Sequence, residues 1–336
     1  MDKKLIHLAV KEAWKYQGLT YPNPAVGAVV STQEGFVISV QAHKEAGSPH
    51  AEVEAVKDAY IKLTNDKKLL SITDSREIHN YLRVNHNGLF FDKSLHVSLE
   101  PCNHYGKTPP CSMLIKELGF KRVVIGTRDK NKEASGGYEY LKDNKKDNKI
   151  DITITEECQE CKDLLRPFEK WQEEKFVFFK LAMSLNGIID GGKITSDDSF
   201  KMVHKLRDKT DLLIIGGNTV RTDRPTLDAR LVDGKAPDIL IYSKNDNFDR
   251  DIPLFGVPGR EVHISDGFEI VKNYRFVMIE GGEGMLKATK DMVDYYLLFH
   301  SSNFKEGQAP SFSLNLNELC SIGIGPDRLG WYKKVE

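Results

Sequence analysis

Three residues in two short motifs have the chemistry of metal ligands. His50 begins the motif His50-Ala51-Glu52, and Cys102 and Cys111 follow later in the chain. One imidazole and two thiolates can hold a zinc ion, and a catalytic zinc keeps its fourth position for water. Glu52 lies two residues after His50, so it is better placed to carry a proton of that water than to bind the metal itself.

The spacing of the two cysteines differs from that of general nucleobase deaminases. Their zinc signature is H-x-E followed by P-C-x-x-C, whereas eight residues separate the cysteines of this chain. Two other interpretations remain open at this point, namely a metal-free coincidence and a closed structural zinc site. Three residues could supply the fourth ligand of a closed site: His43, His104 and Cys158.

Length and composition favour a cytoplasmic protein with two domains. The chain has 336 residues, of which 40% are hydrophobic and 29% are charged. Its net charge of −1 gives no indication of nucleic-acid binding. No apolar run approaches the roughly 20 residues that span a bilayer. Five cysteines without a secretion signal predict reduced thiols, and we expect the C-x-x-C of Cys158 and Cys161 to be reduced on a helix.

The first half of the chain has the pattern of an α/β domain. We expect helices over residues 5–17, from His50 and over 111–118, and strands at 25–30, 35–40, 95–99, 123–126 and 150–154. His50 and Glu52 then lie in the first turn of one helix and Cys111 at the start of another, where backbone amides favour negative charge. The polar residues 64–93 are typical of an insertion with a short helix near 74–83. We expect His79 and His86 at its surface.

The second half repeats the alternation of strands and helices. A helix over 156–168 and a charged connector at 169–175 precede it. Strands are predicted at 176–182, 212–216, 239–242, 261–264 and 276–279, and helices at 200–206 and 285–292. The glycine-rich turn 281–284 could hold a phosphate, but the chain lacks a G-x-G-x-x-G motif after a first strand. The tail after Leu297 is short and polar. We therefore expect one domain at 1–150, another at 174–336, and a connecting strand and helix at 151–173.

The segment from Glu100 to Cys111, EPCNHYGKTPPC, completes the first motif. Together with His50-Ala51-Glu52 it resembles the bifunctional deaminase/reductase family of riboflavin biosynthesis, whose second cysteine ends a loop of the type P-C-x-H-x-G-[KR]-T-P-P-C. The resemblance extends from residues 22–27 to residues 324–327. It implies a cytidine-deaminase-like three-layer α/β domain followed by a dihydrofolate-reductase-like α/β domain.

The resemblance also implies an activity for each domain. The first domain would deaminate a diaminopyrimidinone ribosyl phosphate at a zinc ion held by His50, Cys102 and Cys111, with Glu52 as the proton carrier. The second would reduce the ribosyl side chain of the product to ribityl with NADPH. Residues implied to contact the deaminase substrate are Asn23, His43, His104, Lys107, Asp129 and Asn131.

Three stretches carry the resemblance in the second half: Phe179–Gly187, Gly217–Arg230 and Glu280-Gly281-Gly282. They are similar to the family patterns K-L-x-x-S-L-D-G, G-x-x-T-V-x-x-D-x-P-x-L-x-x-R and E-[AG]-G. Lys180 would lie near the reacting carbon. The substrate-facing residues would be Arg207, Leu227, Arg230 and Glu280. The residues implied for the cofactor are Ala182, Thr219, Asp223, Ser243, Gly282, Glu283, Gly284, Met285 and Leu286.

Three departures from the family pattern fall in the second half. Asn186 stands where the family has Asp, Asp190-Gly191-Gly192-Lys193 replaces a stretch with serine and tryptophan, and the tail after Leu297 is short. Two alternatives therefore remain, a deaminase with a degenerate reductase-like domain and a zinc-stabilised interaction module. We expect a phosphoribosylated pyrimidine as the substrate, a homo-oligomer, and neither nucleic acid nor a membrane as a partner.

Overall fold

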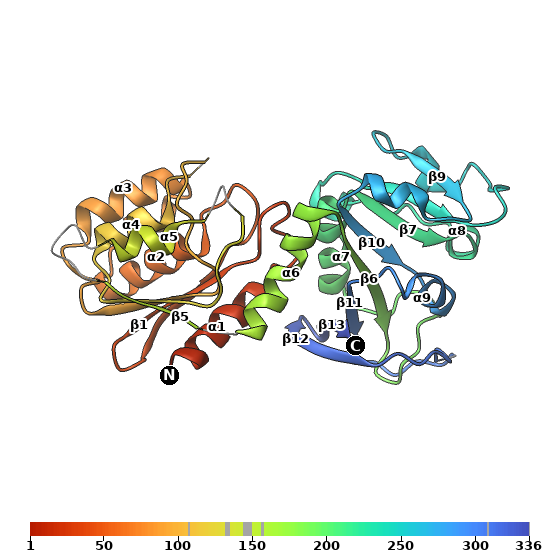
Figure 1. The fold of residues 1–336 in the computed structure, drawn as a ribbon. Coiled ribbons are helices and arrows are strands. Elements are labelled where there is room, and N and C mark those ends of the chain that lie inside the picture. The colour runs from red at the N-terminus through yellow and green to blue at the C-terminus, as the bar shows by residue number, and fades with distance from the viewer. Residues whose placement is uncertain (107, 132–134, 144–149, 156–157, 308, 336) are drawn as a thin grey trace. The chain divides into compact units, whose positions relative to one another are not determined.

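The protein consists of two compact units, Met1–Phe168 and Glu169–Glu336, each with its own β-sheet (Figure 1). The computed structural model describes residues 1–106, 108–131, 135–143, 150–155, 158–307 and 309–335. Among the described residues, no helix has both the length and the apolar character needed to cross a membrane.

The first unit contains a mixed sheet of five strands in the order β2-β1-β3-β4-β5. The strands are β1 (Gly27–Thr32), β2 (Val37–Ala42), β3 (Lys93–Val97), β4 (Arg122–Ile125) and β5 (Asp151–Ile154). β1 is antiparallel to β2 and β3, whereas β3, β4 and β5 are parallel. The carboxyl ends of β3 and β4 therefore lie at the same edge of the sheet, and the segment after β3 carries Cys102.

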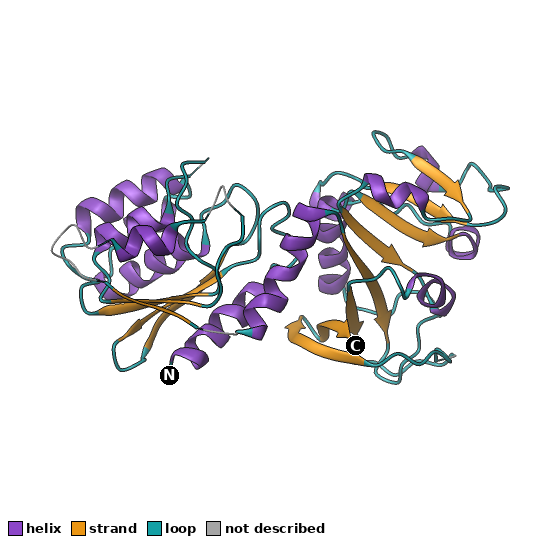
Figure 2. Ribbon diagram, in the orientation of Figure 1, coloured by secondary structure: helices purple, strands orange, loops and turns teal. Residues whose placement is uncertain are grey.

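Helices cover both faces of this sheet (Figures 1 and 2). α1 (Asp2–Trp14) lies on one face, and α2 (Ala51–Thr64), α3 (Ser75–Asn85), α4 (Cys111–Leu118) and α5 (Gly137–Lys142) lie on the other. Alternation along β1 explains the two layers, because Ala28 and Val30 join the core beneath α2 while Val29 packs against Leu5 and Ala9 of α1. The result is a three-layer α/β domain.

The predicted insertion is part of the core of the first unit. The 3-10 turn η1 (Lys67–Ser71) and α3 bring Leu69, Ile78 and Leu82 into the apolar core. His79 is only 2% exposed, so its prediction as a surface residue is wrong, and His86 is half-buried. The physical reason is long-range packing, since α3 contacts both α2 and α4, whereas the local sequence shows a helix of mostly polar residues.

The second unit contains an eight-stranded sheet in the order β12-β13-β11-β6-β10-β7-β8-β9. Its strands are β6 (Phe176–Met183), β7 (Leu212–Gly216), β8 (Asp238–Tyr242), β9 (Val262–Ser265), β10 (Phe276–Glu280), β11 (Tyr295–His300), β12 (Leu316–Ile324) and β13 (Asp327–Lys334). The six strands from β11 to β9 are parallel, and β13 and β12 extend the sheet in antiparallel fashion. The other elements are α7 (Asp197–Lys209), α8 (Gly217–Asp223), α9 (Glu283–Thr289), η2 (Arg230–Val232), η3 (Pro253–Gly256) and η4 (Glu269–Asn273).

Two expectations about the second half are wrong. The tail is not merely polar, because it forms β12 and β13, and Leu329 and Trp331 of β13 are buried. The charged connector is helical, because α6 (Gln159–Glu173) continues through most of it. Trp171 of α6 packs edge-on against Phe276 at a ring distance of 5.4 Å, and that buried contact outweighs the charged composition around it.

The expected connecting segment 151–173 is distributed over the two units. β5 pairs with β4 and is the edge strand of the first sheet. α6 crosses the division between Phe168 and Glu169.

Candidate functional site

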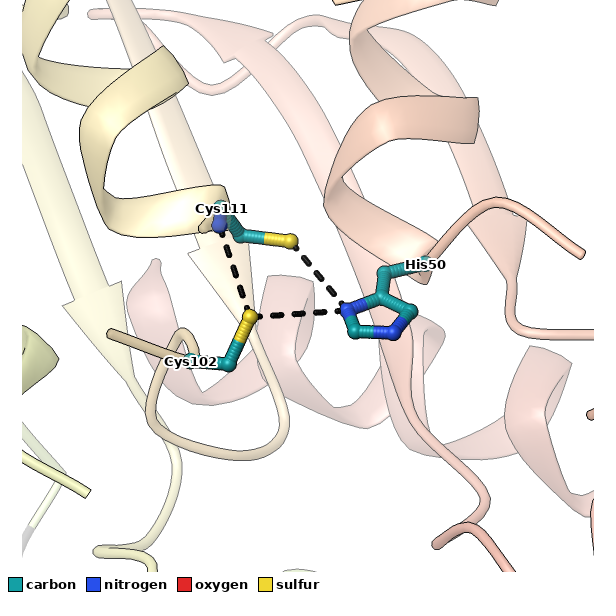
Figure 3. A group of neighbouring side chains, drawn as sticks. All are labelled: His50, Cys102 and Cys111. Carbon is teal, nitrogen blue, oxygen red and sulfur yellow. Dashed lines mark hydrogen bonds between the residues drawn. The ribbon is translucent and has the colours of Figure 1, made fainter. Parts of the chain in front are cut away.

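His50, Cys102 and Cys111 converge at one edge of the first sheet (Figure 3). The Nδ1 atom of His50 lies 3.6 Å from the Sγ atom of Cys102 and 3.4 Å from that of Cys111. His50 is the N-cap of α2, and Cys111 is the first residue of α4. Two helix starts and the loop after β3 therefore deliver the three ligand atoms.

The separations between these atoms fit a tetrahedral zinc ion. Zn–S bonds of about 2.3 Å and Zn–N bonds of about 2.05 Å at a tetrahedral angle place sulfur and nitrogen about 3.6 Å apart. The two measured distances agree with this value. Among the described residues the group has three ligands, all within 4.8 Å of one another, which leaves room for a fourth ligand such as water.

The electrostatics of the cluster favour a bound cation. The hydrogen bond from Cys111 and the nearby His50 lower the pKa of Cys102 to about 4, so a thiolate is present at neutral pH. The backbone amide of Cys111 also faces this sulfur, at 3.4 Å. Glu52 is 4% exposed, and burial followed by the Cys102 charge raises its pKa to about 7. This carboxyl group can therefore hold or release a proton near neutral pH.

Asn23 and His43 lie beside the cluster. The side-chain amide of Asn23 donates to Nε2 of His43 at 3.2 Å, and Nδ1 of His43 donates to the Pro49 carbonyl at 3.1 Å. The His43 ring meets the His50 ring edge-on at 5.4 Å. Burial lowers the pKa of His43 to about 4, so it is a neutral imidazole with both nitrogens engaged. It is not a fourth metal ligand in this arrangement.

The other predicted deaminase residues lie on the loops around Cys102. His104 is exposed, and Asp129 and Asn131 are half-buried, with the Asn131 amide donating to Asp129 Oδ1 at 2.8 Å. Burial raises the pKa of Asp129. Lys107 lies outside the described residues.

Glu100 organises these loops, and the sequence prediction gave it no function. Its buried carboxylate accepts hydrogen bonds from the amides of Asp129, Gly136 and Tyr138 at 3.3, 3.1 and 2.9 Å. Arg128 pairs with the same carboxylate at 3.1 Å. Its position in the sequence could have revealed this role, because a carboxylate at a strand end directly before Pro-Cys can reach the loop of the neighbouring strand.

In the second unit, Glu280 lies at the centre of a buried charge cluster. Arg207 binds its carboxylate in bidentate fashion at 2.9 and 3.1 Å, and the Lys180 ammonium lies 3.7 Å away. Burial opposes ionisation, but the charges of Arg207 and Lys180 prevail and lower the pKa of Glu280 to about 2. Burial lowers the pKa of Lys180. Three predicted site residues from β6, α7 and β10 are thus brought together.

The remaining predicted substrate residues lie on the segment after α8. Leu227 is buried with a φ of 56°, a conformation that a leucine rarely adopts, and Arg260 donates to its carbonyl at 2.8 Å. Arg260 holds this segment in place and was not predicted. Arg230 is exposed and pairs with Asp228 at 3.0 Å.

A cavity of about 570 Å³ lies at the carboxyl ends of β7 and β8, beside the turn before α9. The predicted cofactor residues that line it are Thr219, Ser243, Gly282, Gly284 and Met285. The lining, taken over the described residues, does not include Ala182, Asp223, Glu283 or Leu286. Arg221 and Lys244 also line the cavity and were not predicted. Arg221 stacks over the Phe248 ring at 4.1 Å and donates to Ser243 Oγ at 3.3 Å, so its cation is held in position.

The three departures from the family pattern contact one another. The Asn186 side chain accepts from the Lys305 amide at 3.0 Å and donates to the Lys305 carbonyl at 2.8 Å. An aspartate could make only the first of these bonds. The Lys305 ammonium donates to the carbonyls of Gly191 and Lys193 at 2.8 and 2.9 Å. Asn186, the altered 190–193 stretch and the segment after β11 therefore form one hydrogen-bonded unit.

The two halves of the chain match two known protein families. Residues 1–127 match the cytidine and deoxycytidylate deaminase zinc-binding region, and residues 175–302 match the RibD C-terminal domain. The first match contains His50, Glu52, Cys102 and Cys111, and the second contains the Glu280 cluster.

Proteins of riboflavin biosynthesis are similar to much of this chain. The riboflavin biosynthesis protein RibD of Aquifex aeolicus is 35% identical over 240 residues, which cover 69% of this chain and 58% of that protein. RibD of Synechocystis is 32% identical over 62% of this chain and 50% of its own length. The chain thus spans between half and two thirds of the length of these relatives.

Solved structures cover the whole chain. One is a diaminohydroxyphosphoribosylaminopyrimidine deaminase/5-amino-6-(5-phosphoribosylamino)uracil reductase from Thermotoga maritima, with 26% identity, a TM-score of 0.63, and coverage of 99% of this chain and 98% of that one. RibD of Acinetobacter baumannii, with 22% identity, a TM-score of 0.61, and coverage of 100% and 99%, supports the same fold.

Loss of a thiolate ligand should remove the metal. Loss of a residue that supports a metal ligand weakens metal binding by roughly 10–100-fold. Cys111 is itself a proposed ligand, so we expect Cys111→Ser to weaken zinc binding by more than this. Zinc per chain, measured by mass spectrometry of the purified protein after dialysis, checks this. Cys320→Ser, in β12 of the second unit, is the matched control and should keep the wild-type zinc content. Equal zinc in the two variants would contradict the assignment.

The Glu280 cluster should make the second unit sensitive to acid. Because the pKa of Glu280 is lowered from 4.5 to about 2, its stabilisation is present above pH 4.5 and lost as the pH falls toward 2. The shift corresponds to roughly 3 kcal/mol. We expect Glu280→Gln to unfold more easily than wild type at pH 7, with the difference shrinking in that acid window. Denaturant titrations across the pH range measure it, with exposed Glu269→Gln as the control. A difference independent of pH would contradict this reading.

Proposed function

The chain belongs to the RibD family of riboflavin-biosynthesis proteins, and on that premise we propose that it is a bifunctional deaminase and reductase. The first unit would hydrolyse the amino group of 2,5-diamino-6-(5-phosphoribosylamino)pyrimidin-4-one. The second would reduce the ribosyl side chain of the product to ribityl with NADPH. The observation that carries the proposal is the three-ligand cluster of His50, Cys102 and Cys111 with the buried Glu52 on the ligand helix.

Glu52 moves the protons of the deamination. A zinc ion held by the three ligands supplies Lewis-acid activation of a water molecule. Glu52 accepts a proton as that water adds to the ring carbon, and it then protonates the amino group that leaves as ammonia. A pKa of about 7 suits both steps, because the carboxyl group must accept and release a proton in one cycle.

Residues around the cluster would position the substrate. The Asn23 side-chain amide, which donates to Nε2 of His43, can also bind a pyrimidinone ring. His104 is exposed on the cysteine loop, where it can reach a substrate that enters from solvent. We propose that Lys107, Asp129 and Asn131 contact the ribose phosphate end, where Lys107 and Asn131 offer a cation and a hydrogen-bond donor to the phosphate and the Asp129 carboxylate can accept from a ribose hydroxyl.

The reductase reaction would use the Glu280 cluster and the 570 Å³ cavity. NADPH supplies the hydride. Lys180 of β6 pairs in register with Glu280, the last residue of β10, and its ammonium can donate a proton to the oxygen of the carbon that is reduced. Arg207 holds Glu280 ionised, and we propose that Arg230 and Leu227 border the ribose phosphate.

The cavity has the chemistry of a nucleotide site. We propose that Thr219, Ser243 and the turn from Gly282 bind NADPH, with Arg221 and Lys244 as cations for its phosphates. Ala182, Asp223, Glu283, Met285 and Leu286 remain proposed cofactor residues.

We also propose catalytic domains at 1–150 and 174–336, with residues 151–173 joining them, and a homo-oligomer. We do not favour a degenerate second domain, because Lys180 and Arg207 both lie within 4 Å of the Glu280 carboxylate.

Removal of the proton carrier should stop ammonia release without loss of the metal. We expect Glu52→Gln to lower kcat for ammonia release by about 10²–10⁴-fold while zinc content is unchanged. A coupled assay for ammonia with the diaminopyrimidinone substrate measures this. Glu54→Gln, two residues further along α2 and paired with Lys44 at 3.2 Å, is the matched control. Full activity of Glu52→Gln with zinc bound would contradict the role of Glu52 as the proton carrier.

The second unit should oxidise NADPH only with the deaminated intermediate. We expect absorbance loss at 340 nm on addition of that intermediate to wild type, and a roughly 10²-fold lower kcat for Lys180→Met, which loses the positive charge near the reacting carbon. Lys205→Met, exposed on α7, is the control and should match wild type. No NADPH oxidation by wild type at saturating substrate would leave only the deaminase function.

A further inference from the structure

Cys158 and Cys161 form a close thiol pair at the start of α6. Their Sγ atoms are 2.7 Å apart, and both are free cysteines. The Cys158 carbonyl accepts a hydrogen bond from the Lys162 amide at 3.1 Å, so the two thiols lie on one helical turn. Cys158 is half-buried, whereas Cys161 is only 1% exposed. One sulfur of the pair can therefore be reached from solvent and the other cannot.

The two thiols also differ in acidity. The hydrogen bond from Cys161 lowers the pKa of Cys158 to about 7, and the same contact raises the pKa of Cys161. The amides of the first helical turn add to the stabilisation of a thiolate at this end. Near neutral pH the accessible sulfur is thus the nucleophilic one, and the buried sulfur keeps its proton.

The sulfur of Cys161 is packed closely against the end of β4. A Cβ atom added to Gly126, the residue after β4, would lie 2.4 Å from Cys161 Sγ and 2.6 Å from the Ser98 carbonyl oxygen. Only glycine leaves room for the sulfur at this position. A disulfide bond is about 2.05 Å long, so the two sulfurs, 2.7 Å apart, are already close to bonding distance.

We propose that Cys158 and Cys161 are a redox-active dithiol that small-molecule disulfides oxidise to an intramolecular disulfide. The Cys158 thiolate attacks one sulfur of the oxidant, forms a mixed disulfide and releases one thiolate, which takes up a proton. Cys161 then loses its proton and attacks Cys158 Sγ, which releases the second thiol. The dithiol loses two electrons and two protons, and the oxidant becomes two thiols. Neither proposed active site uses these sulfurs.

Peptide mapping of the zinc-loaded full chain tests the proposal. Trypsin releases residues 150–162, which contain Cys158 and Cys161 and neither the zinc ligands nor Cys320. We expect about a tenfold excess of oxidised over reduced glutathione to make this peptide two hydrogens lighter and resistant to iodoacetamide, with recovery after dithiothreitol. A peptide that keeps both alkylatable thiols under these conditions overturns the proposal.

Single variants test the order of attack. In Cys161→Ser the mixed disulfide with glutathione should accumulate on Cys158, because the resolving thiol is absent. In Cys158→Ser the buried Cys161 should stay unmodified. Cys320→Ser is the control and should form the disulfide as wild type does, and bound zinc reports that the first unit of each variant is folded. Glutathione on Cys161 of folded Cys158→Ser, or none on folded Cys161→Ser, overturns the assignment of the nucleophile.

Discussion

Most of the first unit can be understood from the need to bring three ligand atoms within 4.8 Å of one another. The ligands come from segments more than fifty residues apart, so no local structure can assemble them. Parallel pairing of β3 with β4 places the loops that follow both strands at one edge, and α2 and α4 begin at that edge. The amide of Ser112 donates to the Cys102 carbonyl at 3.2 Å, which joins the start of α4 to the cysteine loop. A metal ion would bind to side chains that these hydrogen bonds already hold in position.

Local chemistry and spacing predicted that His50, Cys102 and Cys111 would lie together, and they do. The helix from Cys111 begins at the predicted residue, and His50 lies at the start of its helix, because short apolar patterns that mark a helix are encoded nearby in the sequence. The role of the Glu100 carboxylate was not predicted because its partners are amides of a loop about thirty residues later. What a carboxylate binds cannot be read from its neighbours in the chain.

Other features depended on contacts that a single sequence does not display. His79 lies on a helix with a polar composition, yet the packing of α3 against α2 and α4 buries it. β12 and β13 were missed because their burial is decided by pairing with each other and with β11. The departures at Asn186 and at residues 190–193 looked like losses in isolation. They are mutually compensating, because Lys305 bonds to both across a large separation in sequence.

α6 limits where the chain can be cut. Its first part belongs to one compact unit, where the Leu164 carbonyl accepts from Gln17 at 2.8 Å, and its last turn belongs to the other, where Trp171 meets Phe276. A cut beside Leu164, Leu165 or Trp171 would expose a side chain that is buried in the intact helix. Fragments that end there would carry exposed apolar surface, which favours aggregation.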